Sequence, residues 1–177
     1  LHCPGGIQPG PPGRPARPLT LAMRIAHIFK TTGLSGAEGH ILTLSNALAL
    51  EGFDCRLLVL EDPARRPEAL YAAARTAGVD FVPVPLAGDW DMRAVMRLVR
   101  EIRAFDAQIV HTHMIHGDTF GTLAAGWTRR VLVQSRHNHD PFRRRLPVRL
   151  LLRVLSSPAR TVIAISESLA AFTRDVE

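Results

Sequence analysis

Short apolar segments alternate with longer segments of helical periodicity along most of the chain. The apolar segments predict β-strands at residues 23–29, 53–60, 79–86, 107–112, 131–136 and 161–165. The helical segments run from the end of a loop at 31–39 to about residue 50, then over 68–77, 91–105, 118–127 and 147–155, and Ser166 is placed to cap one more helix. This alternation predicts an α/β fold: a parallel sheet with helices on both faces.

Function is expected at one edge of that sheet. In parallel α/β sheets, ligands bind in the crevice beyond the carboxyl ends of the strands. The loops that follow four of the predicted strands, at residues 31–39, 113–118, 137–142 and 166–168, are therefore the segments to search. The third strand has edge character, because Pro83 and Pro85 cannot donate to a ladder.

Composition bounds the domain organisation. The 177 residues suffice for one α/β domain, here residues 23–177, and no apolar run approaches the roughly 18 residues of a membrane-spanning helix. Residues 1–22 hold six of the 13 prolines and four of the 13 glycines, which predicts a disordered leader with no signal-peptide core. Cys3 and Cys55 imply no disulfide framework, and a cytoplasmic, reducing location is expected.

The net charge of +6 is concentrated in one region. Residues 136–160 contain seven arginines and one acid, so the rest of the chain is neutral overall. A uniformly basic nucleic-acid binder is therefore not expected. Arg145, Arg149 and Arg153 form one stripe of the predicted helix 147–155. With Arg143 and Arg144 they form either a solvated face or a peripheral contact with anionic lipid headgroups at the inner face of the plasma membrane.

The glycine-rich loop after the first strand is a candidate phosphate site. Gly33 and Gly36 allow a tight turn, and the N–H groups at the start of the next helix attract anions. The loop is neither a GxGxxG fingerprint nor a P-loop. The alternative is an ordinary turn in which Ser35 caps the helix and Glu38 favours its N-terminal dipole.

Histidines follow the fourth strand. Alternation directs His111 and His113 to the same face, where one or both can be core residues, whereas His116 and Asp118 are predicted to lie in the loop and reach a ligand. Imidazole suits Zn²⁺, but no Cys or Glu ligand stands at metal-site spacing, so no metal is expected. A contact with a sugar hydroxyl or phosphate is the favoured interpretation.

Polar residues also end the fifth strand. His137 lies nearest the strand end and is the strongest candidate there, and Asn138 can donate hydrogen bonds to an oxygen-rich substrate. His139 and Asp140 fit a polar turn equally well. Ser166, at the start of the loop after the sixth strand, is the remaining substrate-binding candidate.

Four segments taken together resemble a known family. The strings MRIAHIF-x-TTGLSGAEGHILTLSNAL, IVHTHMIHGDTFGTLAA, VLVQSRHNHDPFRR and TVIAISESL occur in this order, and each crosses the carboxyl end of a strand. They resemble the N-terminal, Rossmann-like domain of GT-B glycosyltransferases, specifically the retaining family 4, which transfers sugars from nucleotide sugars to glycan or lipid-linked acceptors. The resemblance extends from residue 23 to the last residue.

The resemblance implies roles for individual residues. The loop residues Gly33, Ser35, Gly36, Ala37 and Glu38 would approach the donor diphosphate and the acceptor. His137 would lie beside the transferring sugar as the catalytic residue. The acceptor pocket would be shaped by His113, His116 and Asp118. Similar enzymes need no metal or other cofactor, because helix N-termini and basic side chains stabilise the leaving nucleoside diphosphate.

The sequence departs from that family in one large respect. The second nucleotide-binding domain of GT-B enzymes, with its paired glutamates, has no counterpart within these 177 residues. The chain is therefore expected to be a fragment, or a truncated gene product, that is inactive alone. Two alternatives are a GT-B nucleotide-sugar epimerase or phosphorylase, and a non-catalytic Rossmann-like module on a membrane surface.

Overall fold

The computed structural model describes residues 22–88, 91–139 and 141–176. Its elements in chain order are β1 (Arg24–Lys30), α1 (Gly36–Leu50), β2 (Asp54–Glu61), α2 (Glu68–Ala77), β3 (Asp80–Pro85), α3 (Met92–Ala104), β4 (Ile109–His113), α4 (Met114–Thr128), β5 (Val131–Arg136), the 3-10 turn η1 (Pro141–Arg144), α5 (Leu146–Ser156), β6 (Thr161–Ala164) and α6 (Glu167–Val176). Apart from residue 22, the predicted leader 1–22 lies outside the described residues, as does Asp140.

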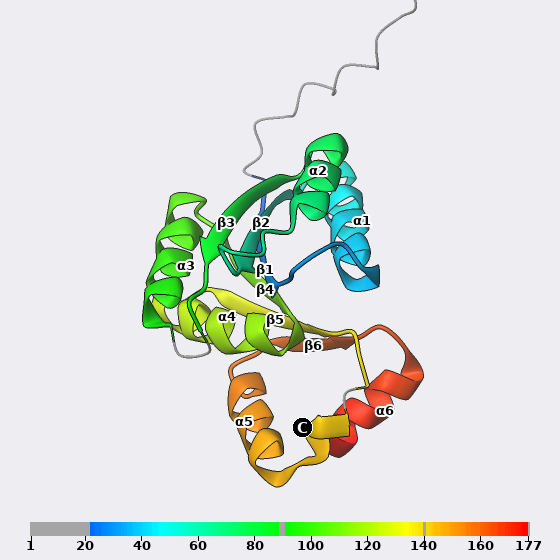
Figure 1. Cartoon of the computed structure of the whole chain (residues 1–177). Helices are drawn as coiled ribbons and strands as arrows, with labels where there is room; N and C mark the ends of the chain where they lie inside the picture. The colour runs from blue at the N-terminus through cyan, green and yellow to red at the C-terminus, as the bar shows by residue number, and fades with distance from the viewer. Residues whose placement is uncertain (1–21, 89–90, 140, 177) are drawn as a thin grey trace, which may run out of the picture.

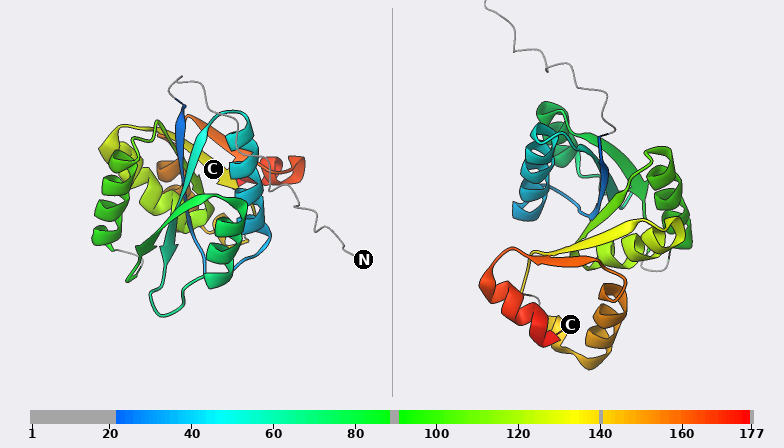
Figure 2. Two further views of the ribbon diagram at one scale, coloured as in Figure 1. Left: turned by 90° about the horizontal axis from the view of Figure 1, so that it is seen from above. Right: turned by 180° about the vertical axis from the view of Figure 1, so that it is seen from behind.

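The six strands form one parallel sheet in the order β3-β2-β1-β4-β5-β6. Helices cover both faces, α1 and α2 on one and α3 and α4 on the other (Figures 1 and 2). The Rossmann-like fold is thereby confirmed. The strand order reverses between β1 and β4, and the crevice at such a switch point is where ligands bind in sheets of this kind.

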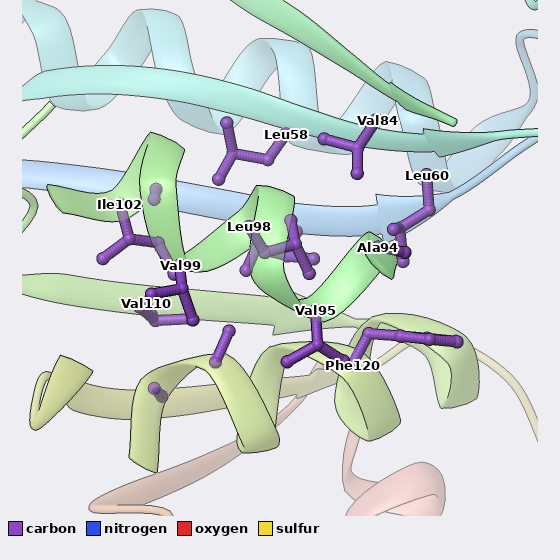
Figure 3. Close-up of a cluster of buried hydrophobic side chains, with 14 of the residues drawn as sticks. Leu58, Leu60, Val84, Ala94, Val95, Leu98, Val99, Ile102, Val110 and Phe120 are labelled. Atoms are coloured by element: carbon purple, nitrogen blue, oxygen red, sulfur yellow. The ribbon is translucent and has the colours of Figure 1, made fainter. Parts of the chain in front are cut away.

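Apolar side chains fill both interfaces between helices and sheet. Figure 3 shows the larger cluster, in which α3 packs on β2 and β3 through Ala94, Val95, Leu98, Val99 and Ile102. The smaller cluster joins α1 and α2 to the opposite face through residues such as Phe29, Ile41 and Leu70. Asp91 caps α3 as its position predicts, accepting hydrogen bonds from the backbone N–H of Arg93 at 2.9 Å and of Ala94 at 3.3 Å.

Glycines bring α4 unusually close to the sheet. A Cβ atom added at Gly117 would lie 2.5 Å from the carbonyl oxygen of Ile28, and one at Gly121 would collide with the Thr112 side chain. The chain passes from β4 directly into α4 through Met114, whose φ of 62° lies in the left-handed region. This sharp turn leaves no loop between β4 and α4, and it fixes where the last residue of β4 points.

Two sequence-based boundaries are wrong at the predicted site. Because α4 starts at Met114, the expected loop 113–118 does not exist, and His116 and Asp118 lie in the first turns of a helix. Helix α1 starts at Gly36, so Gly36, Ala37 and Glu38 belong to its first turn and not to a loop. The edge position of β3, inferred from its prolines, is confirmed.

Candidate functional site

The loop between β1 and α1 is held by its own polar side chains. The Thr31 hydroxyl donates to the carbonyl oxygen of Gly33 at 2.8 Å and accepts from the backbone N–H of Gly33 at 3.1 Å. The Glu38 carboxylate reaches back to Ser35, accepting from its backbone N–H at 3.0 Å and from its hydroxyl. The loop thus has one defined conformation at the N-terminus of α1.

Glu38 carries a charge in a nearly buried position. Its burial acts to raise the pKa of the carboxyl, but hydrogen bonds from Ser35, Thr31 and the backbone outweigh this and leave the pKa below its ordinary value. Glu38 is therefore ionised at neutral pH, where it balances part of the positive end of the α1 dipole.

Open space lies above this loop. A hollow of 410 Å³ is lined by Lys30, Thr31, Thr32, Gly33, Leu34, Ser35 and Glu38. A Cβ atom added at Gly33 or Gly36 would meet nothing within 4 Å. The packing of the chain itself therefore does not require glycine at these two positions, and of the two Gly33 lines the hollow.

A larger hollow continues along the same edge of the sheet. It measures 1180 Å³ and is lined by Lys30, Asp62, Pro63, Ala64, Pro85, Leu86, Ala87, Gly88, Asp91, Met92, Arg93 and Arg97. Sequence reasoning missed it, because its walls come from segments with no recognisable motif. Lys30 borders both hollows, which places them side by side at the ends of β1 to β3.

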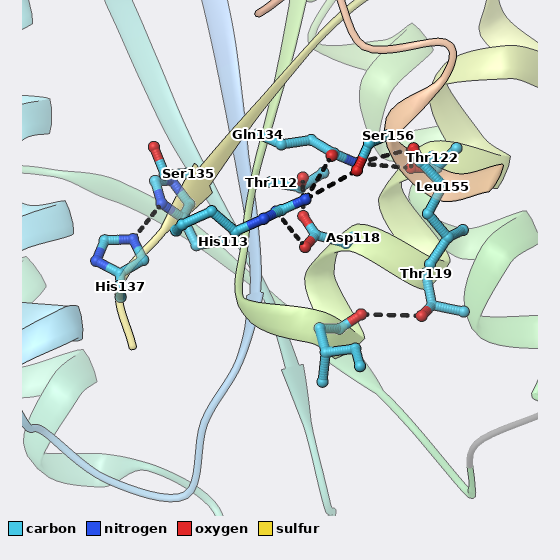
Figure 4. A network of polar contacts seen from close by, with 12 residues as sticks. Thr112, His113, Asp118, Thr119, Thr122, Gln134, Ser135, His137, Leu155 and Ser156 are labelled. Carbon is cyan, nitrogen blue, oxygen red and sulfur yellow. Dashed lines mark hydrogen bonds and ion pairs between the residues drawn. The ribbon is translucent and has the colours of Figure 1, made fainter. Parts of the chain in front are cut away.

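Histidines from three adjacent strands meet beneath α1. His27 of β1 pairs in register with His111 of β4, and His113 pairs with Ser135 of β5. His27 Nδ1 lies 3.1 Å from His113 Nε2, and His113 Nδ1 lies 3.0 Å from His137 Nε2. Figure 4 shows the rings of His113 and His137 turned toward each other. The row leads from the core to the carboxyl edge.

These histidines are neutral at pH 7. Burial lowers the pKa of His27 and His113 well below the ordinary value, and neighbouring histidines lower each further. Burial and the charges of His137 and His40 lower the pKa of His111 to about 4. The pKa of His137 is lowered by burial first and then by His40, while Glu38 acts in the opposite direction.

The same cluster contains the residues best placed to hold a metal ion in the part of the chain described. His27, His111 and His113 each offer a ring nitrogen, and these atoms lie within 4.8 Å of one another. Two of the nitrogens in this group, His27 Nδ1 and His113 Nε2, already join in a hydrogen bond at 3.1 Å, which metal binding would have to break. The donor set therefore fits a hydrogen-bonded row better than a metal centre. Sequence reasoning overlooked His27, although alternation along β1 puts it on the α1 face.

Asp118 and Arg136 face the other side of the sheet. Asp118 accepts a hydrogen bond from the Thr112 hydroxyl at 2.6 Å and pairs with the Arg136 guanidinium at 2.6 Å. Arg136 also donates to Gln134 and Ser156, each at 3.0 Å (Figure 4). Because Asp118 is fully buried, it does not offer the ligand contact expected of it. Arg136 is fully buried too, so it is not part of the basic surface counted from the sequence.

The remaining candidates lie at different depths. His113 is fully buried, whereas His116 and His137 are half-buried and Asn138 is exposed. The His137 ring also stands edge-on to His40 of α1, with centroids 5.5 Å apart. The Ser166 hydroxyl accepts a hydrogen bond from the backbone N–H of Leu169 at 3.2 Å, which confirms Ser166 as the cap of α6. The structure thus brings the α1 loop and His137 to one edge and holds Asp118 away from it.

Helix α5 exposes apolar and basic side chains together. Leu146, Leu150 and Val154 follow one another at every fourth position and are 68%, 53% and 69% exposed. Arg145 and Arg153 are exposed beside them, while Arg149 and Arg144 reach the α6 residue Asp175. The Arg143 side chain lies outside those described. Among the described residues, every helix is too short or too polar to cross a membrane.

Comparison with known proteins places this geometry in a family. The model of Glycosyltransferase Family 4 matches residues 34–176. Similar solved structures include Alr3699/HepE from Anabaena in complex with UDP and glucose (16% identity, TM-score 0.69, 87% of this chain and 41% of that one). MurG from Acinetobacter baumannii (14%, 0.60, 83% and 42%) is another.

A third similar structure is a putative UDP-N-acetylglucosamine 2-epimerase from Listeria monocytogenes (13% identity, TM-score 0.62, 88% of this chain and 42% of that one). At these identities the likeness establishes the fold. The chain spans about two fifths of the length of each of these three proteins. No curated protein sequence matches it.

Proposed function

The chain belongs to glycosyltransferase family 4, and from this premise we propose that it forms the N-terminal, acceptor-side domain of an enzyme that transfers a sugar from a nucleotide sugar to a glycan or lipid-linked acceptor. One observation carries the proposal: the open hollow at the N-terminus of α1 and the neutral, half-buried His137 share the carboxyl edge of the sheet. UDP and glucose in the similar Anabaena structure support a nucleotide-sugar ligand.

The residues at this edge have different roles toward the diphosphate and the transferring sugar. Gly33, Ser35, Gly36 and Ala37 approach the diphosphate, whose negative charge is favoured by Lys30 and by the N-terminus of α1. His137 lies beside the transferring sugar as a hydrogen-bonding and proton-handling group.

The acceptor-side residues act in two ways. His116 and Asn138 are the accessible candidates for acceptor contact, together with Ser166 at the neighbouring strand end. His113 and Asp118 are fully buried, so they act indirectly, through the side chains to which they are hydrogen-bonded.

The proposed reaction needs no resident metal. A retaining transfer builds negative charge on the departing diphosphate, and the positive end of α1 with the nearby cation supplies the stabilisation that a divalent ion gives in other enzymes. Turnover is accordingly expected to survive a chelator.

Transfer also requires a donor-binding domain. The chain spans about two fifths of the length of the similar solved proteins, and we propose that the isolated 177 residues bind ligand weakly and transfer no sugar.

A nucleotide-sugar epimerase is the second candidate, because one of the similar structures carries that description. The two reactions differ in their products. A transferase consumes the nucleotide sugar only with an acceptor and releases nucleoside diphosphate. An epimerase converts the nucleotide sugar without an acceptor and releases none. Chromatography of a labelled nucleotide sugar incubated with the complete gene product, with and without acceptor, distinguishes them.

We further propose that α5 docks this domain peripherally on the inner face of the plasma membrane, in the cytoplasm, where a lipid-linked acceptor would be presented. The exposed stripe of Leu146, Leu150 and Val154, flanked by Arg145 and Arg153, supports this: leucines can enter the headgroup region while arginines bind anionic lipid.

A further inference from the structure

Three histidines form a continuous row of nitrogen-to-nitrogen hydrogen bonds. His27 Nδ1 meets His113 Nε2 at 3.1 Å, and His113 Nδ1 meets His137 Nε2 at 3.0 Å. His113 is the middle member and uses both ring nitrogens. His137, the outermost member, faces His113 with Nε2, so its Nδ1 lies on the far side of the ring, away from the row (Figure 4).

Such a row has only two consistent proton arrangements when all three rings are neutral. Each neutral imidazole carries one N–H and one lone pair, and each hydrogen bond needs one of each. Either all three rings carry the proton on Nδ1 and every bond points outward, or all three carry it on Nε2 and every bond points inward. One ring cannot change its tautomer without the others.

The inner end of the row favours the outward arrangement. His27 Nε2 is buried and meets no hydrogen-bond partner within the described residues. The inward arrangement would place an N–H donor there, and orphaned N–H groups are rarer in protein interiors than under-used acceptors. The outward arrangement leaves only a lone pair.

The outer end of the row keeps a neutral ring. The ionised Glu38 at the start of α1 acts to raise the pKa of His137, but burial outweighs it. His40 and Arg136 oppose full protonation of His137, so the neutral ring prevails.

We propose that His27 and His113 are positioning residues that hold His137 as its Nδ1–H tautomer, so that His137 presents a hydrogen-bond donor to an acceptor oxygen of the ligand. The tautomer itself depends only on the row. The ligand, a sugar hydroxyl or phosphate oxygen, rests on the proposed function.

Nitrogen-15 NMR tests the row directly on the 177-residue chain. Long-range proton–nitrogen spectra at pH 7.5 distinguish protonated from unprotonated ring nitrogens. The expected result is protonated Nδ1 in His27, His113 and His137, with nitrogen–nitrogen couplings across both hydrogen bonds. Protonated Nε2 in His113 and His137 overturns the proposal. Neither result depends on whether the chain belongs to a transferase or an epimerase.

A pair of variants tests the direction of control. His113→Phe removes the donor to His137 Nε2 while keeping a ring in the core, so His137 should shift toward the Nε2–H tautomer that free histidine favours. Ser135→Ala is the matched control, because Ser135 bonds His111 at 2.8 Å and lies outside the row. An unchanged His137 tautomer in His113→Phe overturns control by the row. If that variant does not fold, the wild-type spectrum still decides the arrangement.

Discussion

Asp118 and Arg136 form an ion pair in which both side chains are fully buried and their charged atoms lie 2.6 Å apart. Asp118 stands on α4 and Arg136 ends β5, so the pair ties a helix to the strand that leads to His137. Gln134 and Ser156 accept further hydrogen bonds from the guanidinium, and the Thr112 hydroxyl donates one to the carboxylate. The buried charges are thus paired and hydrogen-bonded, as a low-dielectric interior requires.

Removing one charge of this pair should destabilise the fold. Asp118→Ala leaves the Arg136 guanidinium buried without its carboxylate, and we expect a loss of about 3–5 kcal/mol in the free energy of unfolding. Urea denaturation followed by circular dichroism measures it. His116→Ala, two residues earlier on the same helix, is the control and should cost far less. Unchanged stability in Asp118→Ala would refute a structural role and restore the ligand contact expected from the sequence.

Alanine substitutions at Gly36 and Gly117 should differ in their effects on stability and on nucleotide-sugar use. Gly36→Ala places its methyl group in open space and should leave the free energy of unfolding within about 1 kcal/mol of wild type while weakening nucleotide-sugar use. Gly117→Ala pushes a Cβ atom to 2.5 Å from the Ile28 carbonyl oxygen and should cost about 1–3 kcal/mol. Thermal melts together with KM for the nucleotide sugar separate the two effects. Equal destabilisation by both changes contradicts the prediction.

The histidine row predicts a specific loss of stability in acid. The folded-state pKa values of His27, His111 and His113 lie below the ordinary 6.5. As pH falls through 6.5, these histidines therefore bind protons in the unfolded chain but not in the folded chain. Stability is therefore complete above pH 6.5 and declines below it, by up to about 1.4 kcal/mol per pH unit for each histidine. For His111 the decline ends near pH 4.

Urea denaturation at pH 7.5, 6.0 and 5.0 measures this dependence. His111→Phe deletes one of the titrating groups and should reduce the slope of stability against pH by about one proton, whatever its effect on stability at pH 7.5. A slope identical to that of wild type would mean that His111 titrates alike in both states.

Vesicle sedimentation tests the proposed membrane surface. The chain should bind vesicles that contain phosphatidylglycerol more tightly than vesicles of phosphatidylcholine alone, because Arg145 and Arg153 each contribute about 1 kcal/mol near an anionic surface. Leu150→Ser combined with Val154→Ser should weaken this binding. Leu123→Ser, which changes a 47% exposed leucine on α4, is the control. Equal binding to both vesicle types excludes anionic-lipid recognition.

Most of the fold follows from local pattern, whereas much of the site does not. Strand alternation, the Asp91 and Ser166 caps and the prolines of β3 are signals within a few residues, and the structure confirms what they predict. The sequence does not predict the start of α4, because the left-handed conformation of Met114 has no local sequence signal.

The histidine row and the buried pair depend on register between strands. His27 and His111 are 84 positions apart, and only the pairing of β1 with β4 brings them together. In the sequence, nothing distinguishes Arg136 from the other arginines. Its burial is explained only by the structure, in which Asp118 of α4 lies beside it. Sequence periodicity gives the face of each side chain, but the neighbour on that face is a tertiary property.

We propose that sugar transfer from a nucleotide sugar takes place at the edge formed by the α1 loop and His137. The most direct test incubates the complete gene product with labelled nucleotide sugars and a lipid or glycan acceptor extract, with a chelator present. We expect acceptor-dependent release of nucleoside diphosphate, reduced on the order of 100-fold in His137→Ala with an unchanged melting temperature. Acceptor-independent epimerisation, or unchanged turnover in His137→Ala, would contradict it.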